Sequence, residues 1–322
     1  MTTVEVPAAV GQRSRNVGEL VPIRRGFPPP KFARPTIAMP TVLLWLGSFV
    51  LWCAATAAVL CGVNYWWLAV TIVVQGLITF SMFTVLHESI HHVVGRPTWI
   101  NQLFGRLAMP FVSLIGTYPV LKYIHLAHHR NTNESIQDDP DAWSLAGPRW
   151  QLPLRWFTID VWYCRFYLLR ISQRPRKETL GYAVNVTVAL TFMTTLVVLG
   201  YGRELLLVYF LPQRIGMGIL AWWFDWLPHH DLATAKTDRF RATRIRIGWE
   251  RVMCGLLLYQ NYHLVHHIHA AIPFYLYVKA WRAAEAGYLD RNVPIITAWG
   301  QEITPLEYRA RREVTSPHHR CE

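Results

Sequence analysis

Charged residues are scarce in this 322-residue sequence. Asp, Glu, Lys and Arg together make up 16% of it, whereas they make up about 25% of an ordinary soluble domain. Hydrophobic residues make up 52%, and the chain has 15 Trp and 14 Tyr, residue types that gather where a membrane protein meets the headgroup layer. The composition therefore argues against a soluble protein and predicts a membrane protein.

Cysteine is also rare. The five cysteines form no CxxC pair, and an odd, scattered set argues against a disulfide framework and against a cysteine-based zinc site. We interpret them as small buried hydrophobic residues. The sequence also lacks a GxGxxG fingerprint after a strand and a cysteine cluster for an iron–sulfur centre, so it encodes neither of these redox cofactor sites.

Acidic residues are outnumbered by basic ones. The chain has 32 Lys and Arg against 20 Asp and Glu, which gives a formal net charge of +12. No basic run coincides with a recognisable reading element, so we do not expect a nucleic-acid partner. Basic residues that face the cytoplasm and anionic lipid headgroups account for the charge instead.

Four segments are long and apolar enough to cross a bilayer, which takes about 20 residues. They are residues 41–61, 65–86, 180–200 and 205–226. Only Gly62-Val63-Asn64 joins the first two, and only Gly202-Arg203-Glu204 joins the last two. Turns this short predict two antiparallel hairpins, whose outer ends lie on the same side of the membrane.

The distribution of basic residues predicts the orientation and the division of the chain. The N-terminal arm, the stretch 87–178 and the region after residue 230 are rich in Arg and Lys, so the positive-inside rule places all three, and both termini, in the cytoplasm. We expect a disordered basic arm at 1–38, a domain in the cell inner membrane at 39–290 and a cytoplasmic tail at 291–322.

Two further apolar stretches are interrupted. Residues 104–121 contain prolines and a glycine, which predicts a re-entrant or interfacial piece. Residues 150–170 interleave Trp with Arg, which suits a helix in the headgroup layer or, equally, a buried amphipathic helix of a cytoplasmic cap. The expected fold is an all-α integral membrane protein, with four transmembrane helices as two hairpins, interfacial helices and a histidine-rich cytoplasmic cap.

The 14 histidines are clustered. Twelve of them form four groups, each on the cytoplasmic side of an apolar segment. The groups are His87, His91 and His92; His125, His128 and His129; His229 and His230; and His263, His266, His267 and His269. His318 and His319 lie in the tail and are expected to be dispensable. Ionisable groups are costly at membrane depth, so this concentration indicates a functional site.

The spacing of these histidines predicts a metal centre. Residues i, i+3 and i+4 of a helix share one face, so HLAHH at 125–129 and HLVHH at 263–267 each present three imidazoles to one side. Converging helices would supply eight or nine nitrogens, which suits two ions of iron, copper, nickel or zinc. The candidate ligands are His87, His91, His125, His128, His129, His229, His263, His266, His267 and Asp225.

Several acidic residues lie close to these histidines in the sequence and are candidates for contacts with them. Asp225 lies four residues before His229 and shares its helical face, so it is either a ligand or an acceptor for an imidazole N–H. Asp138, Asp139 and Asp141 follow the second group. They either accept hydrogen bonds from imidazoles or form a solvated acidic loop.

Two other functions fit part of the pattern. HESIH at 87–91 also satisfies HExxH, the motif of zinc metalloproteases, but that function leaves both HxxHH triplets without a role. A metal transporter would hold its ligands near the bilayer midplane, whereas these histidines lie at or beyond the cytoplasmic ends of the apolar segments. Both remain remote alternatives.

HESIH, HLAHH and HLVHH, set in this order around two membrane hairpins, resemble the histidine boxes of the membrane fatty acid desaturase and hydroxylase superfamily. The resemblance covers roughly residues 40–285. FDWLPH at 224–229 and QNYHLVHHIHAAIPFY at 260–275 resemble later motifs of bacterial carotenoid hydroxylases and ketolases. The chain departs from that pattern at Glu88, usually Asp, and at His230, often Arg. In the first box, the pair His91-His92 leaves the second ligand ambiguous, and we favour His91.

The resemblance implies two iron ions, O₂ as co-substrate and oxidation of a lipid C–H bond. It favours ring hydroxylation of a β-carotene-type carotenoid, with a fatty acyl lipid desaturase as the alternative. Two electrons per turnover then come from a separate donor such as ferredoxin with its reductase. We expect the basic residues Arg244, Arg246 and Arg251 to steer this donor.

Overall fold

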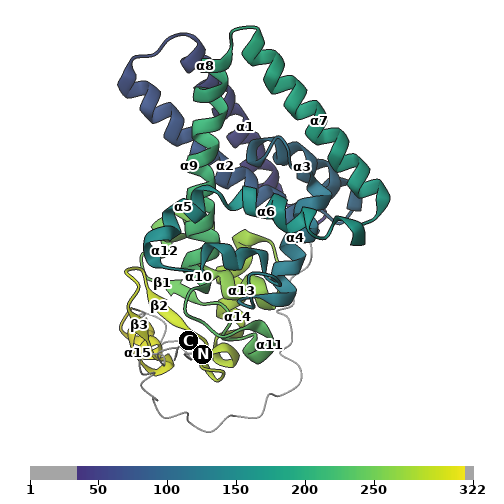
Figure 1. Ribbon diagram of the computed structural model, residues 1–322. Coiled ribbons are helices and arrows are strands. Elements are labelled where there is room, and N and C mark those ends of the chain that lie inside the picture. The colour runs from purple at the N-terminus through teal and green to yellow at the C-terminus, as the bar shows by residue number, and fades with distance from the viewer. Residues whose placement is uncertain (1–34, 316–322) are drawn as a thin grey trace, which may run out of the picture.

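The computed structural model describes residues 35–315, so the arm 1–34, Cys321, His318 and His319 lie outside the described residues. Long helices form one end of the molecule, and short helices with a small sheet form a cap at the other (Figure 1). Residues 36–38, expected in the arm, join the fold. Ile37 pairs with Gly95 in an isolated bridge, and the Ala38 N–H donates to the Val94 carbonyl at 2.7 Å.

Within residues 35–315, four helical runs are long and apolar enough to span a membrane, which confirms the prediction. They are α1 (Met39–Leu60), α2 (Tyr65–Ile90), α7 (Arg176–Val198) and the run Gly202–His229. The last comprises α8 (Gly202–Leu205), the π-helical η4 (Leu206–Phe210), α9 (Leu211–Leu220), the π-helical η5 (Ala221–Trp226) and α10 (Leu227–His229). The second and fourth spans extend three or four residues further towards the cap than predicted, and their last turns carry His87 and His229.

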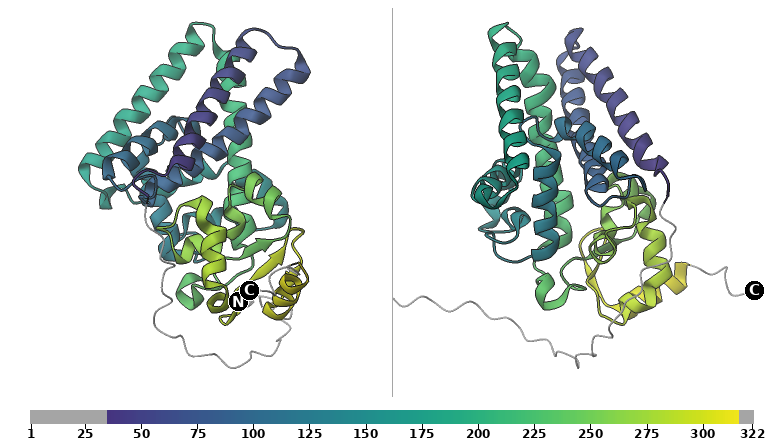
Figure 2. Two further views of the ribbon diagram at one scale, coloured as in Figure 1. Left: turned by 180° about the vertical axis from the view of Figure 1, so that it is seen from behind. Right: turned by 90° about the vertical axis from the view of Figure 1, so that its right-hand side faces the viewer.

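From their shared outer turn at α8, α7 and α9 diverge towards their inner ends (Figure 2). Most of α1 and α7 is exposed and apolar, as expected of lipid-facing helices. Cys53 and Cys61 are also exposed, so the interpretation of every cysteine as buried is wrong for these two, whereas Cys254 is buried.

The helices α2 and α9 pack closely because a glycine lies between them. A Cβ atom on Gly216 would lie 2.4 Å from the Cβ of Thr79, so no larger residue fits without a shift of the helices. Small residues let membrane helices approach in this way. The contact fixes the inner end of α2, with His87, relative to the end of the fourth span, with His229.

The segment between the hairpins is helical. Residues 104–121, expected to be re-entrant or interfacial, belong to α3 (Thr98–Val112), a short connection and the start of α4 (Tyr118–Asn131). Trp99, Leu103 and Leu107 are exposed along one face of α3. Further along lie η1 (Pro140–Ser144), η2 (Arg149–Gln151), α5 (Leu152–Phe157), α6 (Ile159–Leu168) and η3 (Ile171–Gln173). Trp150, exposed before α5, fits the predicted interfacial position.

The cap is formed mainly by the chain after residue 230. Its elements are α11 (Ala235–Asp238), β1 (Ile245–Ile247), α12 (Glu250–Leu256), η6 (Gln260–Tyr262), α13 (His263–Ile268), η7 (Phe274–Leu276), α14 (Tyr277–Leu289), β2 (Ile295–Thr297), β3 (Glu302–Ile303) and α15 (Pro305–Thr315). The strands form a sheet in the order β1-β2-β3, with β1 parallel to β2 and β2 antiparallel to β3.

The sheet and the packing of the last segment were not predicted. Its strands have two or three residues, too few for an alternating pattern to appear in the sequence. Ile295 and Ile303 are buried in one cluster with Trp281 of α14 and Tyr308 of α15. The described part of the expected tail, residues 291–315, therefore packs into the cap.

Candidate metal centre

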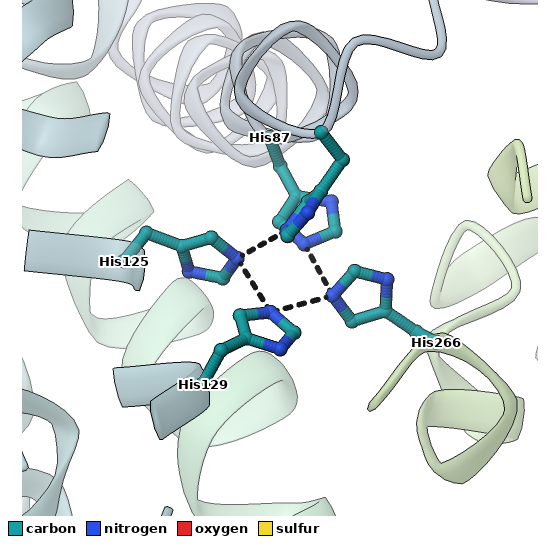
Figure 3. A group of neighbouring side chains, drawn as sticks. His87, His125, His129 and His266 are labelled. Atoms are coloured by element: carbon teal, nitrogen blue, oxygen red, sulfur yellow. Dashed lines mark hydrogen bonds between the residues drawn. The ribbon is translucent and has the colours of Figure 1, made fainter. Parts of the chain in front are cut away.

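Nine histidines lie in two groups where the inner ends of α2 and of the fourth span contact α4 and α13. The first group is His87, His91, His125, His129 and His266, and the second is His128, His229, His263 and His267. Within each group the facing ligand atoms all lie within 4.8 Å of one another. Figure 3 shows four members of the first group with their ring nitrogens turned towards one point.

Each HxxHH box serves both groups. In α4 the i, i+4 pair His125 and His129 belongs to the first group, and the histidine between them, His128, belongs to the second. In α13 the assignment is reversed, since its i, i+4 pair belongs to the second group and His266 to the first. The spacing predicted one shared face, and the structure divides that face between two centres.

Local backbone features place the two boxes. Near the end of α4, the Thr132 hydroxyl donates to the carbonyl of His128 at 2.9 Å. Before α13, Leu258 and Tyr259 have φ values of 46° and 64°, in the left-handed region that side-chain-bearing residues rarely adopt. Such strain costs about 1–3 kcal/mol per residue and is typical of functional sites. It directs the short α13 back towards α4.

Distances within the first group fit a single bound ion. The Nε2–Nε2 distances are 2.9 Å for His87–His266, 2.9 Å for His266–His129, 2.8 Å for His91–His125 and 3.0 Å for His125–His129. Two imidazole nitrogens bound at right angles to one ion, each at about 2.1 Å, would lie about 3.0 Å apart.

The second group has the same spacing. The Nε2 atom of His267 lies 3.0 Å from that of His263 and 3.3 Å from that of His128. The Nε2 atom of His229 is buried without a hydrogen-bond partner among the described residues.

Hydrogen bonds on the far side of three rings set their tautomers. Nδ1 of His128 lies 2.9 Å from an Asp139 carboxylate oxygen, Nδ1 of His263 lies 2.8 Å from the Gln260 side-chain oxygen, and Nδ1 of His229 lies 3.3 Å from the Ala242 carbonyl. Because these oxygens only accept, each Nδ1 carries a proton, and in the neutral ring each Nε2 then turns a lone pair to the centre. Converging lone pairs cannot bond to each other but can bind a cation, so the residues fit a metal.

Two carboxylates hold His128. Besides Asp139, an oxygen of Asp141 lies 3.3 Å from its Nδ1. Burial opposes the charged imidazole, but the carboxylates of Asp141 and Asp139 outweigh burial and raise the pKa of His128 to about 9. The remaining predicted carboxylate, Asp138, instead accepts from the Ser135 hydroxyl at 2.9 Å in an exposed position. Two of the three acidic residues therefore contact a histidine of the second group.

The contact between Asp139 and His128 yields a prediction. Asp139→Asn is expected to weaken metal binding at the second group by about 10–100-fold, the usual cost of losing a residue that orients a ligand. A chelator titration followed by elemental analysis measures this affinity. Asp138→Asn, an identical change one residue away, is the control. Equal affinity in the two variants would show that Asp139 does not support the site.

Known proteins share these features over most of the chain. A family model described as fatty acid desaturase matches residues 64–299. The chain belongs to the fatty acid desaturase family. It is therefore a non-haem di-iron oxidoreductase and an integral membrane protein with four candidate spans, and its histidine groups are consistent with the family's di-iron centre.

Named relatives of this desaturase-family chain are desaturases. Dihydrorhizobitoxine desaturase of Bradyrhizobium elkanii is 24% identical over 296 residues, which cover 80% of this chain and 82% of that protein. The sn-1 oleoyl-lipid 12-desaturase of Synechocystis sp. is 24% identical over 246 residues, or 65% of each chain. The enzyme of the same name from Picosynechococcus sp. is 22% identical over 240 residues, or 65% of this chain and 66% of that one. These relatives favour the desaturase alternative over the carotenoid hydroxylase expected from the sequence.

Three histidines of the sequence groups lie outside both centres. Nε2 of His92 lies 2.7 Å from the Lys122 ammonium nitrogen, and His230 stacks on Trp226 with ring centroids 3.8 Å apart. His269 is buried near Arg239, and burial with this positive charge lowers its pKa to about 4. In the first box it is thus His91, as favoured, that joins the first group.

The two predicted acidic residues of the spans differ in their contacts. Asp225 is buried but lies outside both groups, and one of its oxygens has no hydrogen-bond partner among the described residues. Its role as a ligand stays a prediction. The carboxylate of Glu88 accepts from the Phe274 N–H at 3.2 Å. Glu88 therefore anchors the segment before α14, whereas a metalloprotease would use it as a base beside zinc.

A narrow apolar cavity of about 40 Å³ lies between α3, α4, α6 and α9. Phe83 lines it and packs on Phe224, with ring centroids 4.9 Å apart. The ring of Phe224 in turn lies 5.0 Å from that of His87 and 4.7 Å from that of His263. The ring of Phe83 thus lies between the cavity and His87, and the rings of Phe83 and Phe224 lie between the cavity and His263. Sequence analysis did not find the cavity, because its lining comes from several helices.

Proposed function

We propose that this protein is a membrane desaturase that introduces a double bond into a fatty acyl chain of a lipid. The observation that carries the proposal is the apolar cavity lined by Phe83, whose ring faces His87 in the first of two histidine groups, each spaced for one ion. The two oleoyl-lipid desaturases among the relatives support an acyl substrate. The overall reaction takes two hydrogens from adjacent carbons, one O₂, two electrons and two protons, and it gives one double bond and two waters.

Iron at both groups would supply the oxidising power that an unactivated C–H bond requires. The nine histidines would hold it, and Asp139 would orient His128 by accepting a hydrogen bond from its Nδ1–H, with the Asp141 carboxylate beside the same nitrogen. The cavity walls would align an extended acyl chain, which gives the rate advantage of a fixed geometry. Met109 and Met217 line this space, and their flexible side chains can move aside as the chain enters.

The proposed orientation places the metal centre in the cytoplasm. All nine histidines lie at one end of the spans, and the basic segments flank that end. The positive-inside rule therefore supports a cytoplasmic cap in the inner membrane, as the sequence predicted. The two electrons would then come from a soluble cytoplasmic carrier such as ferredoxin.

Expression in a bacterium that accumulates β-carotene tests the substrate. Acyl chains and pigments are profiled together by mass spectrometry, with His128→Ala as the control. We expect new unsaturated acyl chains with the unaltered protein alone and unchanged pigment. New hydroxylated carotenoid with unchanged acyl chains would instead support the carotenoid function that residues 224–229 and 260–275 suggested.

A further inference from the structure

The cap has a second, much larger hollow that the proposed reaction does not use. It is an open groove of about 1160 Å³ between α12, the turn after β2, α14 and α15. Trp249 and Trp299 are exposed at its rim, with ring centroids 5.7 Å apart. A groove of this size with aromatic side chains at its edge resembles a protein-docking surface, where Trp is enriched.

The charge of the groove is strongly positive. Four arginines line it, and the acidic residue among its lining is Glu250. The arginines are Arg251, Arg282, Arg311 and Arg312. Glu250 accepts from the Gly248 N–H at 2.9 Å. An excess of positive charge in a concave surface attracts an acidic partner and speeds its association.

One wall of the groove includes the residue that precedes the second histidine group's His263 in the chain. Tyr262, buried in its wall, is the chain neighbour of His263. Its ring centroid lies 6.3 Å from that of Trp281, another wall residue. The Trp281 indole N–H donates to the Tyr308 hydroxyl at 2.8 Å. A carrier bound in the groove would therefore contact a wall of buried aromatic side chains, one of which is the chain neighbour of His263.

This location revises the steering residues expected from the sequence. Arg244 is buried and donates to the carbonyl of His230, and Arg246 donates to the carbonyls of Thr297 and Ala298. Both arginines hold the cap together. Of the three expected residues, Arg251 alone is exposed.

We propose that an acidic one-electron carrier protein docks in this groove and passes its electrons past Tyr262 to the metal site at His263. The proposal rests on the proposed desaturase function, which needs two electrons from outside the chain. Each carrier would be oxidised by one electron per visit, so two visits would complete one turnover.

Charge reversal in the groove tests the proposal. The iron-loaded full chain in nanodiscs is supplied with an acidic [2Fe–2S] ferredoxin, kept reduced by NADPH and its reductase. Arg251→Glu with Arg282→Glu is compared with Lys236→Glu and Arg241→Glu, an equal change on and beside α11, which lies on the other side of the cap (Figure 1). We expect the groove variant to raise the KM for ferredoxin about tenfold and to flatten its salt dependence, with little effect of the control.

A single turnover after chemical reduction separates this proposal from the proposed function. Dithionite-reduced protein, mixed with O₂ and acyl lipid, should give the same product yield in both variants and in the unaltered chain. Docking in the groove would be overturned if the single-turnover yield is normal and the KM for ferredoxin is the same in both variants. It would also be overturned if the unaltered chain gives a normal single-turnover yield but no turnover with reduced ferredoxin. A groove variant that alters only the dependence on anionic phospholipid would assign the groove to lipid headgroups instead. No product from any chemically reduced sample would contradict the desaturase function itself.

Discussion

His263→Ala and His266→Ala are each expected to lower product formation by about a thousandfold or more, as loss of an essential catalytic group does. The iron content should fall from two ions per chain to one or none. Each side chain is fully surrounded by protein, and each belongs to a different group. Alanine would therefore remove one ligand and leave a cavity that no neighbouring nitrogen fills. Iron analysis and lipid mass spectrometry on the purified variants check both effects.

The matched controls are His92→Ala and His230→Ala. These residues are chain neighbours of His91 and His229 but lie outside both groups. They should keep two iron ions and most of the activity. Full iron and full activity in His266→Ala would refute the first group as a metal site, and the same result in His263→Ala would refute the second.

Val112→Trp is expected to reduce desaturation of a long acyl chain by about a hundredfold while both iron ions stay bound. Val112 is buried and lines the cavity near its α3 side. An indole there would fill the narrow space that the acyl chain needs. Overpacking costs about 1–3 kcal/mol of stability, so thermal unfolding is measured beside turnover and iron content.

Leu107→Trp provides the control for that change, because Leu107 lies on the exposed face of the same helix. It should retain activity. Val112→Ala, which widens the cavity, should also stay active. If Val112→Trp folds, keeps its iron and desaturates at the normal rate, the cavity is not the acyl site.

Sequence patterns predicted the long apolar helices and the clustered histidines. Continuous apolar runs identified all four spans, since crossing a bilayer requires them. Helical spacing identified eight of the nine histidines of the two groups, because i, i+3 and i+4 positions share a face. His229 was selected for its spacing from Asp225, which lies outside both groups. Helical spacing could not show that His128 and His266 point away from their own box partners. That division depends on where α4 and α13 lie relative to each other.

Features built from distant segments escaped prediction. The three-residue strand β2 pairs with β1 across about fifty intervening residues, which no local pattern reveals. The basic groove combines α12, α14 and α15 for the same reason. Arg244 was predicted to be an exposed steering residue because it lies in a basic segment. In the structure its guanidinium instead donates to a backbone carbonyl inside the cap.

Substrate class was the weakest sequence inference. Residues 224–229 and 260–275 tilted it to carotenoids, but they carry His229 and the three histidines of α13. Much of their pattern is thus required by the metal site, whatever the substrate. The lining of the cavity, which would determine the substrate under the proposed function, is drawn from other residues.

The most direct test of the account uses a perdeuterated acyl lipid with the iron-loaded protein, O₂ and reduced ferredoxin, followed by mass spectrometry of the acyl chains. We expect a product that has lost two deuterium atoms and gained no oxygen, and that is absent with His128→Ala. A product that has lost one deuterium and gained one oxygen atom would show hydroxylation and would contradict the desaturase function.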